Sequence, residues 1–392
     1  MTISHQVDLH TIGGVERLIT DYLKASRGNF SHCITVMNRK IHPFIKQDIK
    51  NYAKRIDHLK YIWGLRLPQI FRGIRKRFIL NKTAPQLTVY WNCYEQNLNS
   101  LASLKQNMLF YDHGASWNSF IEVKKKDFLR NIKGAIAIGH ASKRMLELNC
   151  EVTCPIHVVK NPLRTLGHRN KPQPKTLPIN RPLKLGMAGR MVPLKGHCLA
   201  LHTLAILKRK GIEATLELAG EGEEYAALQS LARRLGIEKE ILFQGCVQDI
   251  QNFYQSVDIY LHPAIREPFG LTPLEAMSYG CVVISSLVDG LPEFVQQGKT
   301  GFCIEPTLPL KDIIGLGGST KNVPRFVYNP LEDCLAAPKL VDPYHIAESI
   351  LAVLKSPKDF EKLSKEGIDY SHTHFQFDQY VLQLEQVFNQ YI

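Results

Sequence analysis

Two glutamates eight residues apart frame the stretch Glu267-Pro-Phe-Gly-Leu-Thr-Pro-Leu-Glu275. Pro268 and Gly270 keep its first half out of a helix, and Thr272-Pro273 favours the start of one. A carboxylate at each end of such a turn, with backbone N–H groups between them, can bind a polyhydroxylated, phosphorylated ligand at several points. The stretch is therefore a candidate ligand site.

Glu275 also has a purely structural interpretation. Thr272-x-x-Glu275 matches a helix capping box, with Pro273 at the favoured first helical position. In that case Glu275 bonds the backbone N–H of Thr272 and contributes about 1 kcal/mol. Both interpretations stay open for Glu275. Glu267 precedes a proline and has no local capping role, so a functional role is preferred for it.

A basic loop, Gly186-Met-Ala-Gly189-Arg190-Met-Val-Pro-Leu-Lys195-Gly196, follows a strand-like run and opens a helix-like run. A glycine turn lets the backbone approach a phosphate, and a helix N-terminus supplies unpaired N–H groups. Arg190 would bind a diphosphate through paired donors, and Lys195 as a point charge. For either residue alone, a solvated loop cation is an equally good interpretation.

The first half of the chain contains two shorter candidate motifs. Ile12-Gly-Gly14-Val-Glu-Arg17 stands at a strand–helix junction, where paired glycines by themselves are more often a plain turn. Tyr111-Asp-His113-Gly114 ends another strand-like run. Ligands of open parallel sheets bind beyond the strands' carboxyl ends, so His113 is placed to hydrogen-bond a ligand. A packed or surface histidine is an equal alternative.

Together these motifs resemble the donor site of group 1 glycosyltransferases, also called GT4, which have the two-domain GT-B fold. The resemblance is strong from Leu183 to Pro306. In the first half it is confined to Gly13–Arg17, the region of His113, and Asn161-Pro162, where the family more often has Asn-Gly. A further departure lies just before Glu267, where alanine replaces the family's serine.

The resemblance implies a role for each matched residue. Arg190 and Lys195 would bind the pyrophosphate of a nucleotide-sugar, Glu267 the hydroxyls of the transferred sugar, and Glu275 the ribose hydroxyls. His113 would contact the sugar or shape the acceptor pocket. The backbone N–H groups of Phe269, Gly270, Leu271 and Thr272 would lie along the sugar and phosphate. The Gly189 turn would approach the phosphate, and the Gly14 backbone would face the donor phosphate or the acceptor. The turns at Gly220, Gly222 and Asp289–Glu293 also match the family, although strand–helix punctuation is preferred for the first two.

The elements that must position these motifs alternate between strand-like and helix-like runs, which predicts an α/β protein with parallel sheets. We expect two Rossmann-like domains facing a cleft. The first spans residues 1–165 and the second spans 183–374, joined by a proline-rich linker at 166–182. Residues 307–343 break the rhythm and are expected to be an inserted loop region. The final amphipathic segment, 375–392, is expected to return to the first domain.

The net charge of the 392-residue chain is +13, and its distribution is uneven. Residues 1–165 hold 26 Lys and Arg against 11 Asp and Glu, and the rest of the chain carries a net charge of −2. Between Asp57 and Glu95 there is no acidic residue. Within this window, cations alternate with apolar residues from Trp63 to Lys82.

The basic stretch Trp63–Lys82 has two interpretations. Its cations would meet anionic lipid while Trp63, Phe71 and Phe78 enter the membrane interface. Alternatively, its apolar face packs in the core and its basic face is solvated. The charge asymmetry favours the membrane. Nothing matches a nucleic-acid motif, so no nucleic-acid partner is expected.

No apolar run is long enough to span a bilayer, and no signal peptide is visible. Nine scattered cysteines, several inside strand-like runs, are typical of reduced thiols in the cytosol. The sequence therefore predicts a cytoplasmic protein, peripheral at the inner face of the cytoplasmic membrane.

The resulting hypothesis is a retaining hexosyltransferase without a cofactor. Its donor would be a UDP- or GDP-sugar, and its acceptor a saccharide or lipid-linked saccharide in cell-surface polysaccharide or lipopolysaccharide synthesis. No Asp-x-Asp metal motif ends a strand, so metal-independent catalysis is expected. The alternatives are a nucleotide-sugar epimerase or a phosphorylase on the same fold, and a catalytically silent binding partner.

Overall fold

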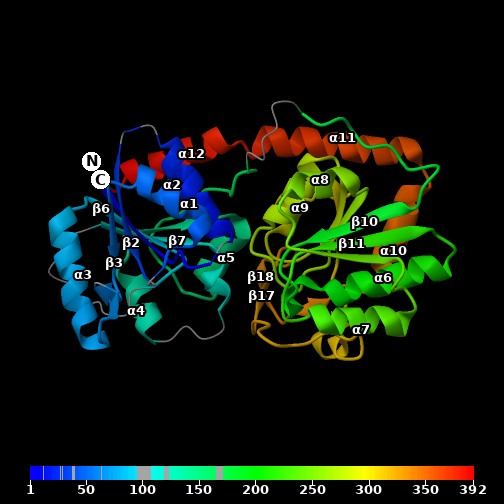
Figure 1. The fold of residues 1–392 in the computed structure, drawn as a ribbon, viewed down its shortest axis with the longest axis horizontal. Coiled ribbons are helices and arrows are strands. Elements are labelled where there is room, and N and C mark those ends of the chain that lie inside the picture. Colours follow the sequence, from blue (N-terminus) through cyan, green and yellow to red (C-terminus); the bar gives the residue numbers. More distant parts are fainter. Residues whose placement is uncertain are drawn as a thin grey trace. The chain divides into compact units, whose positions relative to one another are not determined.

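The computed structural model describes residues 1–11, 13–26, 28, 30–37, 40–62, 64–94, 107–118, 123–164 and 171–392. They form two compact units (Figure 1). The first comprises residues 1–160 and 378–392, and the second comprises residues 161–377. The chain therefore returns to the first unit at its carboxyl end.

The described part of the first unit contains a seven-stranded sheet in the order β3-β2-β1-β6-β7-β8-β9, and its strand pairs are parallel. The strands are β1 (Thr2–Val7), β2 (Ser31–Val36), β3 (Arg55–His58), β6 (Leu87–Trp91), β7 (Asn107–Asp112), β8 (Gly134–Ala137) and β9 (Ile156–Val158). From β1, the next strands in the chain, β2 and β3, lie toward one edge of the sheet, and the later strands, β6 to β9, lie toward the other edge. This reversal marks the switch point at which ligands of open α/β sheets bind.

The helices that connect the strands lie on both faces of this sheet (Figure 1). The helices are α1 (Gly14–Ala25), α2 (Pro43–Tyr52), α3 (Gln69–Thr83), α4 (Val123–Asn131), α5 (His140–Leu148) and α12 (Phe377–Asn389). Smaller elements are the pair β4 (Tyr61–Ile62) and β5 (Leu65–Arg66) and the 3-10 turn η2 (Ala115–Trp117). α12 lies against α1, where the rings of Phe388 and Tyr22 are 6.0 Å apart.

The second unit contains a six-stranded sheet in the order β12-β11-β10-β13-β14-β15, again with parallel pairs. The strands are β10 (Leu183–Ala188), β11 (Ala214–Ala219), β12 (Ile241–Gly245), β13 (Ile259–His262), β14 (Val282–Ser286) and β15 (Gly301–Ile304). Its switch point lies between β10 and β13. The two units are therefore separate Rossmann-like α/β domains, as the alternating pattern predicted.

The helices of the second unit are α6 (His197–Arg209), α7 (Tyr225–Leu235), α8 (Ile250–Ser256), α9 (Leu271–Ser278), α10 (Pro343–Leu354) and α11 (Pro357–His374). Short 3-10 turns, η3 (Pro193–Lys195) and η4 (Leu291–Glu293), follow β10 and β14. Leu185, Leu216, Ile259 and Ile350 belong to the core of this unit and are fully buried. Each such side chain contributes about 1.5–3 kcal/mol through removal from water.

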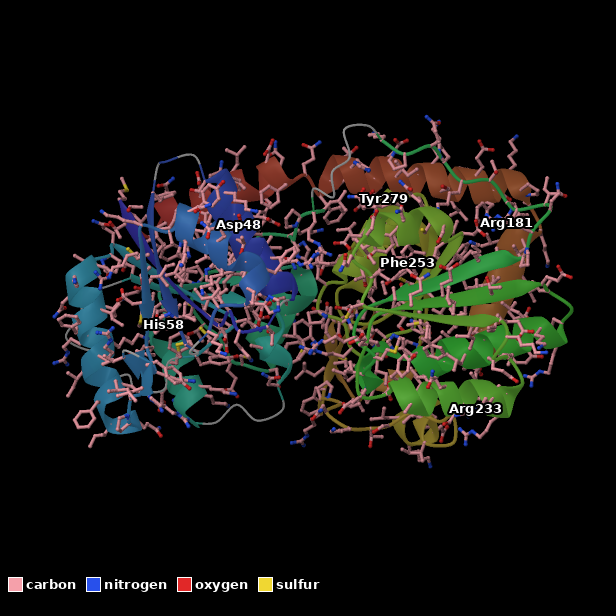
Figure 2. The ribbon with its side chains drawn as sticks, viewed as in Figure 1. Asp48, His58, Arg181, Arg233, Phe253 and Tyr279 are labelled. Atoms are coloured by element: carbon pink, nitrogen blue, oxygen red, sulfur yellow. The ribbon has the colours of Figure 1, made fainter. Side chains whose placement is uncertain are left out.

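An aromatic cluster joins α8 to the end of α9. The rings of Phe253 and Tyr279, both labelled in Figure 2, contact the Tyr254 ring at centroid distances of 5.5 and 5.6 Å. At the start of β10, Arg181 (also labelled in Figure 2) makes two 2.7 Å bonds to the carboxylate of Asp258. The first contact joins α8 to the end of α9, and the second joins the segment before β10 to the residue before β13.

Residues 307–343 are more regular than the sequence suggested. They contain two antiparallel pairs, β16 (Leu308–Pro309) with β19 (Lys339–Leu340) and β17 (Val327–Asn329) with β18 (Cys334–Ala336). The 3-10 turn η5 (Leu310–Ile313) separates the first strand from the others. Ile313, Val327 and Leu340 are buried, so the segment has an apolar underside that packs on the domain.

Candidate donor site

Lys195 and Glu267 meet at the switch point of the second sheet. Lys195 ends the η3 turn after β10, and Glu267 lies in the loop after β13. The two strands are neighbours although many residues separate them in the chain. The Lys195 ammonium consequently forms an ion pair with the Glu267 carboxylate. The basic loop and the glutamate loop identified in the sequence thus converge on one place.

Backbone contacts hold the two loops together. The Ile265 N–H donates to the Leu194 carbonyl at 2.9 Å. Gly196 has a φ of 68°, and a Cβ at this position would stand 2.1 Å from the Pro263 carbonyl oxygen. Only glycine permits this conformation and this approach. These contacts on either side of Lys195 hold its backbone in place.

His262, the last residue of β13, completes a three-residue cluster. Its Nε2 lies 2.8 Å from Glu267 Oε2, the same oxygen that pairs with Lys195. Burial by itself would raise the pKa of Glu267, but the Lys195 charge and the His262 bond outweigh burial and hold this pKa well below its usual value. The carboxylate is ionised and accepts only, so His262 Nε2 carries the donated proton.

His197 lies beside this cluster at the start of α6. Burial lowers its pKa to about 3, and the neighbouring charges of Lys195 and His262 act in the same direction. Its Nδ1 is buried and has no hydrogen-bond partner among the described residues. His197 and His262 were not among the predicted site residues, because a histidine near a strand end gives no sequence signal of its partner.

Arg190 follows Gly189 on the exposed side of the β10 loop. It forms no ion pair with the described residues, which leaves its guanidinium available to a ligand. The loop after β11 packs closely beneath it. A Cβ at Gly220 would stand 1.9 Å from the Gly189 carbonyl oxygen, and one at Gly222 would stand 2.3 Å from that of Met191. These two glycines therefore allow the loop after β11 to contact the loop after β10, a role that goes further than forming a turn.

The segment Phe269–Thr272 starts α9. Gly270, at φ 99°, is the N-cap and α9 begins at Leu271, so the alternative in which Thr272 and Glu275 form a capping box is wrong. The Phe269 ring packs in the core, 5.8 Å from Phe294. Within the described chain, the N–H groups of Phe269 to Thr272 donate to no backbone carbonyl. A helix start with unpaired N–H groups favours an anion.

Glu275 lies on the buried side of α9 and is 0% exposed. Its Oε1 accepts from Arg164 Nε, and its Oε2 accepts from the Tyr254 hydroxyl at 2.9 Å. Arg164 stands 111 residues earlier in the chain. The structure therefore gives Glu275 two partners outside the Lys195–Glu267 pair, and no local sequence pattern indicated either of them.

The first unit has a comparable arrangement at its own switch point. Gly14 is exposed at the first position of α1, after β1, and Ile12 lies outside the described residues. Asn92, after β6, has a φ of 53°. Its Oδ1 accepts from the backbone N–H groups of His113 and Ala115, both at 3.0 Å. This contact fixes the backbone of the predicted histidine.

The His113 ring stacks on Trp91 at a centroid distance of 5.6 Å and an interplanar angle of 10°. Burial lowers the pKa of His113 to about 3, so the ring is neutral at physiological pH. Its Nε2 has no partner among the described residues. Asp112 instead bonds the backbone N–H and hydroxyl of Ser116 at 3.0 and 2.6 Å, and thus orders the following turn.

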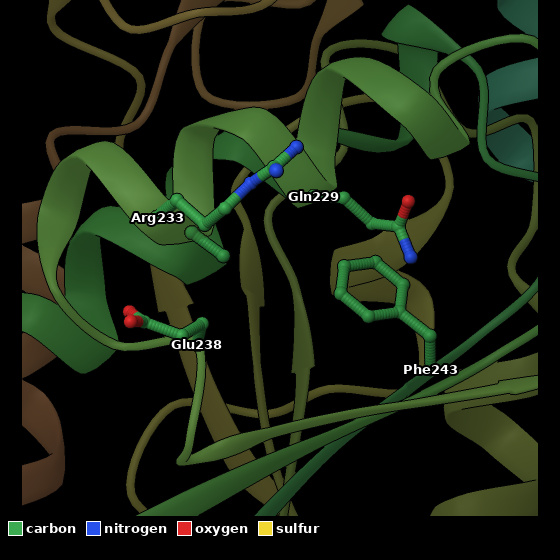
Figure 3. A pocket seen from close by; sticks show the side chains of 5 residues that line it. Gln229, Arg233, Glu238 and Phe243 are labelled. Carbon is green, nitrogen blue, oxygen red and sulfur yellow. The ribbon is translucent and has the colours of Figure 1, made fainter.

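A surface hollow of about 300 Å³ lies elsewhere on the second unit (Figure 3). Gln229 and Arg233 of α7, Glu238, and Phe243 of the edge strand β12 line it. It contains none of the residues that the sequence singled out. The chemistry of the switch point, rather than this hollow, therefore defines the candidate site.

Neither a metal-binding group nor a membrane-spanning helix is found in the described part of the chain. There, no group of three His, Cys, Asp or Glu side chains could hold a metal ion. No described helix combines the length and the apolar character that crossing a membrane requires.

Two Rossmann-like domains with paired switch points define a class, the GT-B fold, and solved structures agree. Over 100% of both chains, the structure matches HepE from Anabaena, solved in complex with UDP and glucose, with a TM-score of 0.70 and 16% identity. At this identity the likeness concerns the fold.

Residues 169–313 match the family model for glycosyl transferases group 1. The N-acetyl-alpha-D-glucosaminyl L-malate synthase of Bacillus anthracis is 36% identical over 94 residues, which are 24% of this chain and 25% of that protein. The lipopolysaccharide core biosynthesis glycosyltransferase LpsE of Rhizobium meliloti is 32% identical over 130 residues, or 33% and 36% of the two chains. The alignments thus span about a quarter to a third of these curated relatives. Residues 169–313 are thus similar to the group 1 glycosyltransferases, and the whole chain has the GT-B fold.

Proposed function

We propose that this protein transfers a sugar from a nucleotide-sugar donor to a saccharide or lipid-linked acceptor. The observation that carries the proposal is the convergence of Lys195, Glu267 and His262 at the switch point of the second sheet. A cation beside a carboxylate suits a ligand that presents a diphosphate next to sugar hydroxyls.

The donor is a nucleoside diphosphate sugar, with UDP preferred over GDP. Support comes from the fold relative HepE, whose structure contains UDP and glucose. Arg190 and Lys195 bind the diphosphate, together with the unpaired N–H groups from Phe269 to Thr272 and the open glycine turn at Gly189. Both contacts within the cluster fall on Glu267 Oε2, which leaves Oε1 to accept from a sugar hydroxyl.

The reaction exchanges one bond at the anomeric carbon for another. The acceptor hydroxyl attacks this carbon as its bond to the diphosphate oxygen breaks, and the hydroxyl proton passes to the leaving diphosphate. Attack on the face that the diphosphate leaves would retain the configuration. Arg190 and Lys195 stabilise the charge that develops on the diphosphate, so catalysis without a metal ion is part of the proposal.

His113 and Gly14 belong to the first unit and are assigned to the sugar or acceptor. The neutral His113 ring has an unpartnered Nε2, which can donate to or accept from a hydroxyl according to its tautomer. Glu275 is the ribose ligand by family resemblance. Its carboxylate holds Arg164 and Tyr254, so a ribose contact requires Arg164 to give way.

An anionic membrane surface is a further proposed partner of the protein. The α3 patch consists of five large apolar side chains, each more than half exposed, and three exposed cations. Its members are Leu65, Ile70, Phe71, Ile74 and Phe78, with Arg66, Arg77 and Lys82. Apolar side chains flanked by cations fit a lipid surface, where each cation contributes about 1 kcal/mol.

The alternative in which the apolar face of this stretch packs in the core holds for part of α3, where Ile79 and Leu80 are buried. Its exposed residues recur at helical spacing, from Ile70 through Ile74 to Phe78. The buried side of the helix also includes a cation, Lys76, which bonds the Tyr90 hydroxyl at 3.0 Å. Lys76 therefore takes no part in the patch, and Trp63 lies outside the described residues.

The cellular role proposed is cell-surface polysaccharide or lipopolysaccharide synthesis at the inner face of the cytoplasmic membrane. The likeness to LpsE and the α3 patch support this role.

The decisive experiment is a nucleotide-release screen. The purified chain is incubated with common UDP- and GDP-sugars, with and without saccharide acceptors, and the released nucleoside diphosphate is measured. We expect release from one donor above the blank. A product that is an altered sugar nucleotide, formed without acceptor, would indicate an epimerase instead, and no release from any donor would favour a silent binding protein.

A further inference from the structure

Asp289 connects the inserted segment 307–343 to the loop that contains Glu267. It follows β14 and is 1% exposed. Its Oδ2 accepts from the Glu267 N–H at 2.8 Å, and its Oδ1 accepts from the Tyr328 N–H of β17 at 2.7 Å. A single buried carboxylate thus bridges the backbone of the candidate catalytic residue and that of the insertion.

Backbone bonds reinforce both ends of this bridge. The Asp289 N–H donates to the Tyr328 carbonyl at 3.0 Å, and the Gly290 N–H donates to the Glu267 carbonyl at 3.2 Å. A Cβ at Gly290 would stand 2.3 Å from the Pro268 carbonyl oxygen, so the turn lies directly against the glutamate loop. The N–H and C=O of Glu267 are therefore both held by residues 289 and 290.

The backbone conformation of Asp289 is one that glycine adopts most readily. Its φ is 49°, in the left-handed region that costs a non-glycine residue about 1–2 kcal/mol. Glycine would adopt this conformation without that cost. It would, however, leave the Glu267 and Tyr328 N–H groups without their carboxylate acceptor.

We propose that Asp289 is a positioning residue for Glu267, and that the hairpin β17–β18 is an integral part of the donor site through its bond to Asp289. The inference rests on the proposed contact between Glu267 and the transferred sugar. It gives the segment 307–343 a role: the hairpin fixes where the Glu267 carboxylate stands relative to the sugar.

The test compares Asp289→Gly with Asn322→Gly. Asn322 lies in the same segment, is exposed, and also has a left-handed φ, of 60°. Both changes relieve the backbone, but only the first removes the bridge. We expect Asp289→Gly to lower turnover of the sugar nucleotide about tenfold or more, because small displacements of a positioning group are costly. Calorimetric affinity for UDP, which lacks the sugar, should change less than about twofold, and Asn322→Gly should match the wild type in both measurements.

Amide hydrogen exchange supplies a readout that does not depend on activity. The Glu267 amide should exchange faster in Asp289→Gly than in the wild type and in Asn322→Gly, because its acceptor is gone. Should Asp289→Gly fail to fold, Asp289→Asn serves, since asparagine tolerates the left-handed region and keeps one carbonyl acceptor. It should show intermediate turnover and intermediate protection.

The outcomes separate this inference from the proposed function. Wild-type turnover together with wild-type exchange at Glu267 in a folded Asp289 variant overturns the positioning role and leaves the glycosyltransferase proposal standing. Faster exchange in a chain that releases no nucleotide from any donor supports the bridge and refutes the proposed function. Equal losses in Asp289→Gly and Asn322→Gly overturn the inference by assigning the effect to backbone flexibility.

Discussion

Lys195 and Glu267, 72 residues apart in the chain, form an ion pair at the switch point of the second sheet. Because His262 donates to the same carboxylate oxygen, the cluster's bonds among the described residues leave Glu267 Oε1 open to a ligand, and the Lys195 side chain is 26% exposed. The predictions for the donor site follow from this division.

Glu267→Gln should lower turnover more than about tenfold and leave the fold intact. An amide oxygen accepts a hydrogen bond more weakly than a carboxylate and cannot neutralise Lys195. Steady-state rates with the donor from the nucleotide-release screen measure the effect, and circular dichroism checks the fold. The control is Glu305→Gln, an exposed glutamate of the same domain. Near-normal turnover of Glu267→Gln would remove this residue from the site.

Arg190→Ala and Lys195→Ala should both weaken UDP binding in calorimetry, since each removes a cation assigned to the diphosphate. The two variants should differ in stability. Arg190 is exposed, so its loss should leave the melting temperature unchanged. Loss of Lys195 strands the buried Glu267 charge and should lower the melting temperature. Arg209→Ala is the control, because Arg209 is also an exposed cation of this domain. Unchanged UDP affinity in both variants would reject their phosphate role.

The α3 patch should bind anionic vesicles in a salt-dependent manner. Changing Arg66, Arg77 and Lys82 to Gln removes about 3 kcal/mol of attraction, or roughly a hundredfold in partition at low salt. Changing Phe71 and Phe78 to Ser should weaken binding at high salt as well, because apolar contact is not screened. Co-sedimentation with vesicles containing phosphatidylglycerol measures both effects.

The matched control for the patch is a triple change to Gln at Lys358, Lys362 and Lys365, exposed cations of α11. It alters the net charge equally at another place. If both triple variants sediment alike, bulk charge alone explains the binding and the patch is ordinary surface.

A series of hydrogen bonds through two buried histidines should make the stability of the protein sensitive to acid. The Trp91 indole donates to His5 Nδ1 at 3.0 Å, and His5 Nε2 lies 3.0 Å from His32 Nδ1. His32 Nε2 in turn lies 2.9 Å from the Ser26 hydroxyl, which donates to Glu385 of α12 at 2.8 Å. These hydrogen bonds can all form only while both histidines are neutral.

Burial lowers the pKa of His32 from 6.5 to about 4, and that of His5 well below 6.5. A pKa that is lower in the folded than in the unfolded state gives stability that is complete above pH 6.5 and is lost as the pH falls toward 4. His32 alone accounts for roughly 3 kcal/mol over this window. Urea unfolding at pH 7, 6, 5 and 4.5 should show this decline.

His32→Gln should make the decline shallower, and His345→Gln, at an exposed histidine, should leave it unchanged. A His32→Gln variant with the slope of the wild type would mean that His32 titrates normally in the folded protein.

Much of the fold could be predicted from the sequence because its signals are local. Apolar runs such as Leu183–Ala188 and glycine or proline turns such as those around Gly270 specify strands and loops within a few residues. Their alternation predicted two parallel α/β units. The loops after β10 and β13 were recognisable as candidate sites from their charges and glycines alone.

Tertiary structure alone decided which charges meet. Strand order brings Lys195 to Glu267. The packing of helices and loops brings Arg164 to Glu275 and places Lys76 in the core rather than on the α3 patch. A cation or carboxylate has the same local sequence signal wherever it lies, because its partner depends on which strands and helices are neighbours. The same holds for Asp289, whose two acceptor bonds join segments that have no common sequence pattern. Residue types thus set the available chemistry, and the packing of distant segments determined which of them act together.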